Sequence, residues 1–501
     1  MLSKKNNRLS DFILLFFLSV SILVSNFSGV YNQEYWMDHG IVFNGAYRIM
    51  NGQIPYRDFY IPTGPVVYYI QAFFNYIFGL NLIALAMHTT SMALVLCLYY
   101  YCILRRDLNK AVSLVLAYYL FMSFCGLINF PHHNLASFFF FLLSVLVLVD
   151  KPSTELSLKR TFFLIVLCLL SFFSKQDVGL LQTVLIGLYI LLFSESKIKN
   201  SLYFLIILFT LFCISLNILL RIENVTYFFN LGQPPHDSRL DCIFSFNALK
   251  TILKSTQFYF IILSIFLWFH KDFLIKRRFI YLLLGINFIT VLVSIPSGTS
   301  NQILIGNLPL SLFLSYKIFF DRYDKKTVLP FIFLSCICLL PITNSILQLA
   351  YSAYLGRNFT RIKGGTYSGS YLQKQKLEDL YKIKSIISKR KSFLNLSHYL
   401  FLDADFNNPP PKNIPIWFDY GTTLFDRELF QLIKYIKDKK PEIILLQHYP
   451  LLELREESVS EWLLLASLKK NGYTTIFKSN ESETMSCILI LKILNTTNLS
   501  S

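Results

Sequence analysis

The sequence predicts a polytopic α-helical membrane protein with a small α/β domain at its carboxyl terminus. Three observations support this fold class. The 501 residues are 54% hydrophobic and only 15% charged, whereas soluble proteins contain about 25% charged residues. Apolar runs of about 15 to 24 residues recur between short polar breaks, which is typical of helices that cross a bilayer. After residue 349 the apolar runs shorten to strand length, and Lys, Glu and Asn become more frequent.

About eleven membrane-spanning helices account for the apolar runs of the first 349 residues. The first run follows the basic segment Lys4-Lys5-Asn-Asn-Arg8 and has no small-residue cleavage site, so we interpret it as an anchor rather than a signal peptide. The predicted spans are 11–28, 82–104, 111–129, 134–150, 161–174, 178–194, 201–220, 256–270, 279–296, 301–319 and 328–347.

The formal net charge is +17, but its distribution argues against a nucleic-acid partner. Basic residues concentrate in alternate loops, for example at Arg105-Arg106 and Lys276-Arg277-Arg278, whereas the intervening loops carry few. This asymmetry follows the positive-inside rule and places the amino terminus in the cytoplasm. An odd number of spans then places residues 350–501 outside the membrane, on the extracytoplasmic side.

The segment 65–79 is apolar, but we predict that it lies on the outer membrane surface. It is short for a span, and its tyrosines suit the interface. If it crossed the membrane, Arg105-Arg106 and every later basic loop would change sides. We therefore assign residues 1–349 to a transmembrane domain, in which residues 29–80 form an outer loop with interfacial helices, and residues 350–501 to a separate domain.

Helices alternate with short buried strands in residues 350–501, as in a small α/β domain. The predicted helices are 371–391, 427–440 and 459–470, the last ending at the stop signal Asn471-Gly472. The predicted strands are 398–403, 414–419, 442–447, 473–477 and 486–493.

The outer loop after the first span carries an unusual set of ionisable residues. Charged groups beside a membrane are costly to place and by default indicate a functional site. Asp38 stands just ahead of a predicted helix over 41–50. It is either merely the N-cap of this helix or a general base for an acceptor hydroxyl, and the two roles are compatible. Asp58 is either held in a local salt bridge by its neighbour Arg57 or takes part in the site.

Other polar residues of the outer loops are candidates for a supporting role. Lys175 and Asp177 interrupt two apolar runs, where Lys175 either pairs with a carboxylate, that of Asp177 or Asp38, or faces a lipid phosphate. The pair His132 and His133 would bind a metal only if the fold brought carboxylates near. The predicted supporting residues are Glu34, His132, His133 and Asp177.

The outer loop resembles that of a known group of enzymes. The similarity lies in the acidic residue after the first span and in three further features: the run Asn51-Gly-Gln-Ile-Pro-Tyr-Arg-Asp-Phe59, the segment Pro62-Thr-Gly-Pro65, and an aromatic run ending at Phe78-Gly79. Together they resemble the first outer loop of the GT-C glycosyltransferases. More narrowly, they resemble the bacterial dolichyl-phosphate-mannose mannosyltransferase-like group, which includes the lipid A aminoarabinose transferases. A similar layout extends over most of the chain.

This resemblance implies an inverting glycosyltransferase of the bacterial inner membrane. It implies a sugar donor on a polyprenyl phosphate and a lipid, glycan or protein acceptor at the outer face. Asp38 matches the loop acid that acts as base or positions the acceptor, and Asp58 is the second catalytic candidate. Relatives place a phosphate-binding lysine where this chain has Thr63, so the predicted phosphate contacts are Arg57, Lys175 and Arg239.

The resemblance leaves a divalent metal open as a cofactor. Relatives often have an acidic pair in this loop, whereas the neighbour of Asp38 is His39. Two other classes of function stay as alternatives, a transporter or flippase of lipid-linked glycans and a non-catalytic envelope assembly protein. A transporter should carry charges or broken helices at mid-membrane, whereas this chain concentrates its acids at the outer face.

Overall fold

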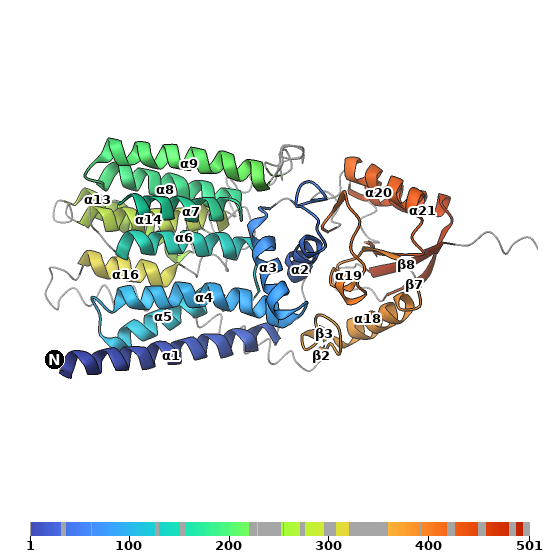
Figure 1. Cartoon of the computed structure of the whole chain (residues 1–501), viewed down its shortest axis with the longest axis horizontal. Helices are drawn as coiled ribbons and strands as arrows, with labels where there is room; N and C mark the ends of the chain where they lie inside the picture. Colours follow the sequence, from blue (N-terminus) through green and yellow to red (C-terminus); the bar gives the residue numbers. More distant parts are fainter. Residues whose placement is uncertain are drawn as a thin grey trace, which may run out of the picture. The chain divides into compact units, whose positions relative to one another are not determined.

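The computed structural model describes most of the chain (Figure 1). The described residues are 2–31, 37–61, 63–125, 130–150, 157–219, 228, 252–253, 255–270, 276–294, 307–319, 359–390, 392–417, 426–448, 457–479 and 487–493. They separate into two compact units. Unit 1 comprises Met1–Val30, Ala86–Ser215 and Pro235–Tyr354, and unit 2 comprises Tyr31–Leu85, Leu216–Pro234 and Leu355–Ser501.

Unit 1 is built from apolar helices. Each of the first ten predicted spans coincides with one of them, and the eleventh, 328–347, lies outside the described residues. The helices are α1 (Leu2–Tyr31), α4 (Leu82–Leu104), α5 (Lys110–Cys125), α6 (His133–Asp150), α7 (Leu158–Phe172), α8 (Gln176–Phe193), α9 (Lys197–Leu219), α13 (Thr256–Phe269), α14 (Arg277–Ser294) and α16 (Leu308–Phe319).

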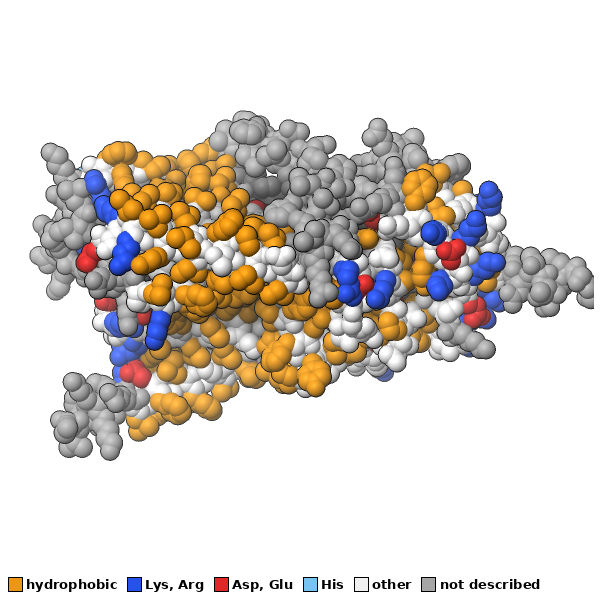
Figure 2. Space-filling model, turned by 45° about the horizontal axis from the view of Figure 1, so that its top comes forward, with side chains coloured by type: hydrophobic (Ala, Val, Ile, Leu, Met, Phe, Trp, Pro, Cys, Tyr) orange, Lys and Arg blue, Asp and Glu red, His pale blue; other side chains and the backbone are white. Residues whose placement is uncertain are grey.

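Five of the described helices are long and apolar enough to cross a membrane, and this makes the chain a multi-pass membrane protein. These candidate spans are Leu9–Tyr31, Leu82–Leu104, His133–Asp150, Gln176–Phe193 and Lys197–Ile218. The most apolar stretch of the last of them is only 6% buried against protein, as expected for a helix that faces lipid. Figure 2 shows hydrophobic side chains gathered over this helical surface.

Buried amides join three helices of unit 1. Asn307, just before α16, donates to Asn287 Oδ1 at 3.2 Å and to Thr290 Oγ1 at 3.1 Å, both on α14. Gln257 on α13 donates to Asn307 Oδ1 at 3.1 Å. Since lipid tails are as apolar as the helix surfaces, such hydrogen bonds help to select helix partners inside a membrane.

In unit 2 the outer loop forms two helices and one short strand, α2 (Met37–Met50), β1 (Phe59–Tyr60) and α3 (Val66–Phe78). The helices α2 and α3 pack closely at Gly45, because a Cβ there would overlap the Tyr68 ring and lie 2.8 Å from Ile416 Cδ1. The segment predicted as an interfacial helix is thus the 13-residue helix α3, which groups with α2 rather than with the long helices of unit 1. Its place on the membrane surface stays a prediction.

The described carboxyl-terminal residues of unit 2 alternate helices and strands. The elements are β2 (Phe359–Arg361), β3 (Tyr371–Gln373), α18 (Lys374–Ile387), β4 (Phe393–Leu396), α19 (Leu402–Asp405), β5 (Ile414–Pro415), α20 (Asp426–Lys439), β6 (Ile443–His448), α21 (Glu457–Lys470), β7 (Tyr473–Lys478) and β8 (Cys487–Ile493). The main sheet has the order β4-β6-β8-β7, with β4 and β6 parallel and β8 antiparallel to both its neighbours.

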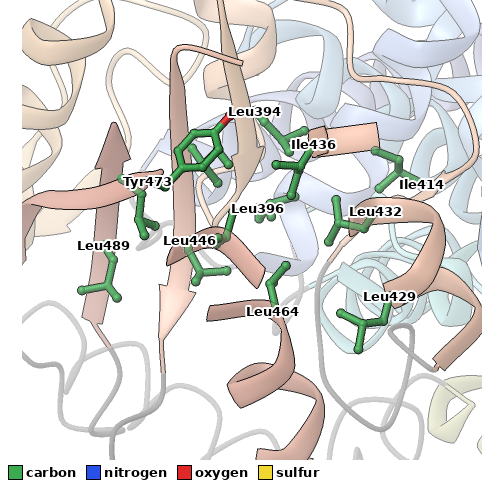
Figure 3. Packing of buried hydrophobic residues seen from close by; sticks show 13 residues of the cluster. Leu394, Leu396, Ile414, Leu429, Leu432, Ile436, Leu446, Leu464, Tyr473 and Leu489 are labelled. Atoms are coloured by element: carbon green, nitrogen blue, oxygen red, sulfur yellow. The ribbon is translucent and has the colours of Figure 1, made fainter. Parts of the chain in front are cut away.

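The core of this region lies between one face of the sheet and the helices α20 and α21. Alternate residues of a strand point to one face, and Leu394 and Leu396 of β4 accordingly meet Ile444 and Leu446 of β6. Leucines of both helices cover them, among them Leu432 and Leu464 (Figure 3). Burial of each large aliphatic side chain contributes about 2 kcal/mol, so this cluster stabilises the sheet and the two helices against each other.

Three predicted elements need correction. The segment 398–403 was predicted as a strand, but the strand is β4, which ends at Leu396, and the short helix α19 begins at Leu402. The predicted strand 414–419 is described only as β5 with two residues. The predicted helix 371–391 starts as the strand β3, and its helical part, α18, ends at Ile387.

The outer loop groups with the carboxyl-terminal residues, whereas we expected it to be part of the transmembrane domain. β1 pairs in parallel with β5, with Phe59 opposite Ile414 and Tyr60 opposite Pro415. The backbone N–H of Asn413 also donates to the carbonyl of Asp58 at 2.6 Å. Backbone pairing over such a sequence distance makes residues 31–85 and 355–501 one compact unit.

Candidate active site

Asp38 lies in the first turn of α2, with its side chain exposed. The helix begins at Met37 rather than at residue 41, so Asp38 is its second residue and the interpretation as N-cap is wrong. The unpaired N–H groups and the positive dipole end of a helix stabilise a carboxylate in this position. An exposed carboxylate at a helix end is well suited to accept a proton from a bound hydroxyl.

The charge of Asp38 acts on a buried hydroxyl of α3, that of Tyr68. The Tyr68 hydroxyl is 3.0 Å from Thr63 Oγ1, and the hydroxyl of Tyr56 donates to the Thr63 carbonyl. Burial raises the pKa of Tyr68, and the negative charge of Asp38 raises it further. Tyr68 therefore stays protonated. Tyr68 could not be predicted as a site residue from the sequence, because a tyrosine in an apolar helix does not by itself indicate a functional site.

Asp58 is almost fully enclosed by donors. It accepts from the backbone N–H of Ile54 at 2.9 Å and from Arg57 Nε at 3.1 Å, and it pairs with Lys412 Nζ at 3.4 Å. Burial by itself raises the pKa of Asp58, but the bonds from Arg57, Ile54 and Lys412 outweigh it and lower the pKa. This geometry favours the salt-bridge interpretation of Asp58, and a catalytic role for it remains a prediction.

Arg57 and Lys412 leave an excess of positive charge beside the outer loop. The two cations share the single carboxylate of Asp58, and their side chains are 34% and 60% exposed. Both can thus reach a ligand phosphate while they hold Asp58. Lys412 could not be singled out in the sequence, because it follows a proline-rich run and lies far from Asp58 along the chain.

A buried polar network links α2 to the carboxyl-terminal region. Asn44 Nδ2 donates to Asp403 Oδ2 at 2.8 Å and to the Leu400 carbonyl at 2.9 Å, and Arg48 Nε donates to Asn44 Oδ1 at 3.0 Å. Burial raises the pKa of Asp403 to about 7, although Arg48, Asn44 and Asn395 favour its ionised form. Burial also lowers the pKa of Arg48 to about 10.

The remaining candidates that the structure describes lie in unit 1. Lys175 Nζ pairs with Asp177 Oδ2 at 3.2 Å, which is the structural alternative considered for Lys175. Lys175 is largely buried, and Asp177 lies in the first turn of α8. The rings of His132 and His133 are 3.9 Å apart, and His132 Nδ1 accepts from the backbone N–H of Asn134 at 3.3 Å.

The structure thus brings Asp38, Arg57 and Asp58 into unit 2 and places the histidine pair and the Lys175–Asp177 pair in unit 1. Glu34 and Arg239 lie outside the described residues. Within the described ranges no three His, Cys, Asp or Glu side chains converge as metal ligands would. We therefore derive no step through a metal.

A family model matches one segment of the chain. Residues 62–219 match the model of the family described as dolichyl-phosphate-mannose-protein mannosyltransferase. No curated protein matches the sequence.

Three solved structures are similar at low identity. ArnT from Cupriavidus metallidurans bound to undecaprenyl phosphate has 10% identity and a TM-score of 0.43, with 96% of this chain and 98% of that chain covered. Its apo state has 11% identity and a TM-score of 0.46, with 97% and 98% covered. The apo oligosaccharyltransferase from Archaeoglobus fulgidus has 11% identity and a TM-score of 0.40, with 91% and 73% covered.

The family match includes the turn at Thr63 and the helix α3 and continues through the helices α4 to α9. Over residues 62–219 this match agrees with the predicted resemblance to the dolichyl-phosphate-mannose mannosyltransferase-like group.

Proposed function

We propose that this protein is an inverting glycosyltransferase that moves a sugar from a polyprenyl-phosphate donor to a cell-envelope acceptor at the outer face of the bacterial inner membrane. The description of the matched family names a lipid-phosphate-linked sugar as donor. The acceptor is a hydroxyl of a lipid, glycan or protein. The observation that carries the proposal is the exposed carboxylate of Asp38 in the first turn of α2, whose charge acts on the buried hydroxyl of Tyr68.

Asp38 acts as the general base. Its carboxylate takes the proton of the acceptor hydroxyl while the hydroxyl oxygen forms a bond to the anomeric carbon. The bond between that carbon and the phosphate oxygen breaks, and the polyprenyl phosphate leaves with the electron pair. Attack opposite to the leaving group inverts the anomeric centre. Proton transfer by a positioned carboxylate accounts for about 10²–10⁴ in rate.

Arg57 and Lys412 stabilise the charge that develops on the leaving phosphate. Together they carry one positive charge more than Asp58 neutralises, and both are partly exposed. Preorganised cations aimed at developing charge are a large source of transition-state stabilisation. Lys175 and Arg239 stay as further candidates for the phosphate, and we give Glu34, His132, His133 and Asp177 a supporting role.

The test is mass spectrometry of envelope glycans and lipid-linked intermediates from cells that lack the protein. We expect one envelope sugar to disappear while its polyprenyl-phosphate form accumulates. Complementation with the wild type restores the sugar, and complementation with Asp38→Asn does not. The matched control is Asp438→Asn, which removes an exposed carboxylate from α20 and should complement fully.

Two results would contradict the proposal. An unchanged set of envelope sugars in the deletion strain would exclude sugar transfer. A loss of glycan with the donor retained on the cytoplasmic face would instead indicate a flippase.

A further inference from the structure

The helix that carries Asp38 is held by residues far away in the sequence. The polar face of α2 and the turn after it meet the segment that contains α19 and the proline-rich run Asn408-Pro-Pro-Pro411. We propose that this contact, which we call the α2 clamp, positions the catalytic carboxylate for sugar transfer. The clamp consists of Asn44, Arg48 and Gln53 on one side and Asp403 with the carbonyls of Leu400, Pro410, Pro411 and Pro415 on the other. The inference rests on the proposed function.

Asn44 is the centre of the clamp. Both hydrogens of its amide are used, one on the Asp403 carboxylate and one on the Leu400 carbonyl, and its oxygen accepts from Arg48. The residues Asn44 and Arg48 are four apart and therefore lie on the same face of the helix. Asn44 is 1% and Asp403 3% exposed, so no solvent can replace a lost partner. Leaving such a group unsatisfied is more costly than the bond itself is worth.

The proline-rich run supplies acceptors to the same face. Arg48 Nη1 donates to the Pro411 carbonyl at 3.1 Å, and Gln53 Nε2 donates to the Pro410 carbonyl at 2.6 Å. Prolines have no N–H and cannot enter a regular ladder as donors, which leaves their carbonyls available. The Arg48 guanidinium also lies over the Phe59 ring, 5.4 Å from its centroid. The clamp therefore fixes both the rotation of α2 and the start of β1.

Two apolar contacts support the hydrogen bonds. Phe43 of α2 packs edge-on against Tyr367, with ring centroids 5.7 Å apart, and Tyr367 lies against Phe401 at 4.8 Å. Through these contacts α2 is anchored to the region that carries the main sheet. Catalytic groups need to be held within a fraction of an ångström, and a displacement of about 1 Å costs about 10² in rate. Asp403, Asn44 and Arg48 are thus positioning residues.

The experiment compares Asp403→Leu with a matched control, Asp405→Leu, in the full-length protein in lipid nanodiscs. Both variants remove a buried carboxylate from α19. Asp405 pairs with Lys384 Nζ at 2.7 Å and accepts from the backbone N–H of Thr366 at 2.6 Å, and both partners lie within the carboxyl-terminal region. Hydrogen exchange of residues 41–50 measures how firmly the clamp holds α2, independently of activity. Steady-state kinetics with the polyprenyl-phosphate sugar measure the effect of the clamp on sugar transfer.

We expect Asp403→Leu to speed exchange in α2 by about tenfold or more, because the amide of Asn44 loses a buried partner that no solvent can replace. We expect kcat to fall by about tenfold or more while the KM for the donor changes little, since the cations that face the phosphate are untouched. Asp403→Asn keeps an acceptor for Asn44, so its exchange rate in α2 and its kcat should both lie close to those of the wild type. Asp405→Leu should leave exchange in α2 at the wild-type rate. If Asp403→Leu does not accumulate, Arg48→Lys replaces it and should show the same two changes in weaker form.

Unchanged exchange in both Asp403→Leu and Arg48→Lys would overturn the clamp. Faster exchange with an unchanged kcat would overturn its positioning role. Full activity of Asp38→Asn would instead overturn the proposed function, while the exchange data would still report on the contact itself.

Discussion

The amide of Asn44 donates a hydrogen bond to the carboxylate of Asp403 at 2.8 Å, although 359 residues separate them in the chain. This bond joins the first helix of the outer loop to the carboxyl-terminal α/β region. It means that the candidate base Asp38 is carried by a unit to which residues 31–85 and 355–501 both contribute. Sugar transfer should therefore depend on residues that contact no substrate.

The stability of this unit should depend on pH through Asp403. Burial raises its pKa to about 7 in the folded protein, whereas an unfolded aspartate titrates near about 4. Between these values the folded state holds a proton that the unfolded state has released. The free energy of unfolding contributed by this group therefore falls as the pH rises from about 4 to about 7, and it stays constant above that.

Thermal unfolding in detergent checks this dependence in wild type and in Asp403→Asn. The wild type should lose more stability than the variant between about pH 5 and about pH 8. Parallel curves for the two proteins would show that Asp403 does not titrate in this range.

The contribution of Asp58 to the stability of the outer loop should have the opposite pH dependence. Burial raises its pKa, but Arg57, the Ile54 amide and Lys412 lower it overall. Its contribution is therefore present above the ordinary aspartate pKa and is lost as the pH falls through the folded pKa. Asp58→Ala should lower the free energy of unfolding near neutral pH by about 1–3 kcal/mol, because three donors lose their partner. The control Asp438→Ala should change it by less than about 0.5 kcal/mol.

Gly45→Val should separate α2 from α3. The new side chain would overlap the Tyr68 ring and approach Ile416, and overpacking of this kind costs about 1–3 kcal/mol. The comparison is Gly187→Ala in α8, where a Cβ would lie 3.4 Å from Phe204, in ordinary contact. Thermal unfolding should show a clear loss for Gly45→Val and little change for Gly187→Ala. Equal melting temperatures for both variants would contradict the close packing of the two helices.

Lys412→Ala should weaken the donor phosphate contact. We expect the KM for the polyprenyl-phosphate sugar to rise by about three- to tenfold, the effect of one partly exposed charge-assisted contact. Lys434→Ala removes an exposed lysine of α20 and serves as the control. If both variants showed the same KM as the wild type, Lys412 would have no role at the phosphate.

Local patterns in the sequence predicted much of the fold. The amphipathic period of 427–440 and the apolar run 442–447 agree with α20 and β6 within one or two residues, because each pattern reflects one face buried in the same core. The strand predicted at 398–403 was wrong. Its apolar residues Leu400, Phe401 and Leu402 are buried in a turn and the start of α19, and burial alone does not distinguish a strand from a packed turn.

The candidate site could be predicted only in part. Asp38 and Arg57 stand out because charges are rare beside apolar runs. Asn44 and Asp403 could not be paired from the sequence, since each is an ordinary polar residue in its own segment and only the fold brings them together. The part of the proline-rich run 408–411 in binding Arg48 and Gln53 depends on backbone carbonyls, which carry no sequence signal.

Single-turnover kinetics of purified Asp38→Asn in nanodiscs test the central claim most directly. The variant keeps the size of the side chain but cannot accept the proton. We predict that sugar transfer from the polyprenyl-phosphate donor falls by about 10²-fold or more, with normal insertion and with donor binding unchanged. Transfer at the wild-type rate by Asp38→Asn would contradict the assignment of Asp38 as the base.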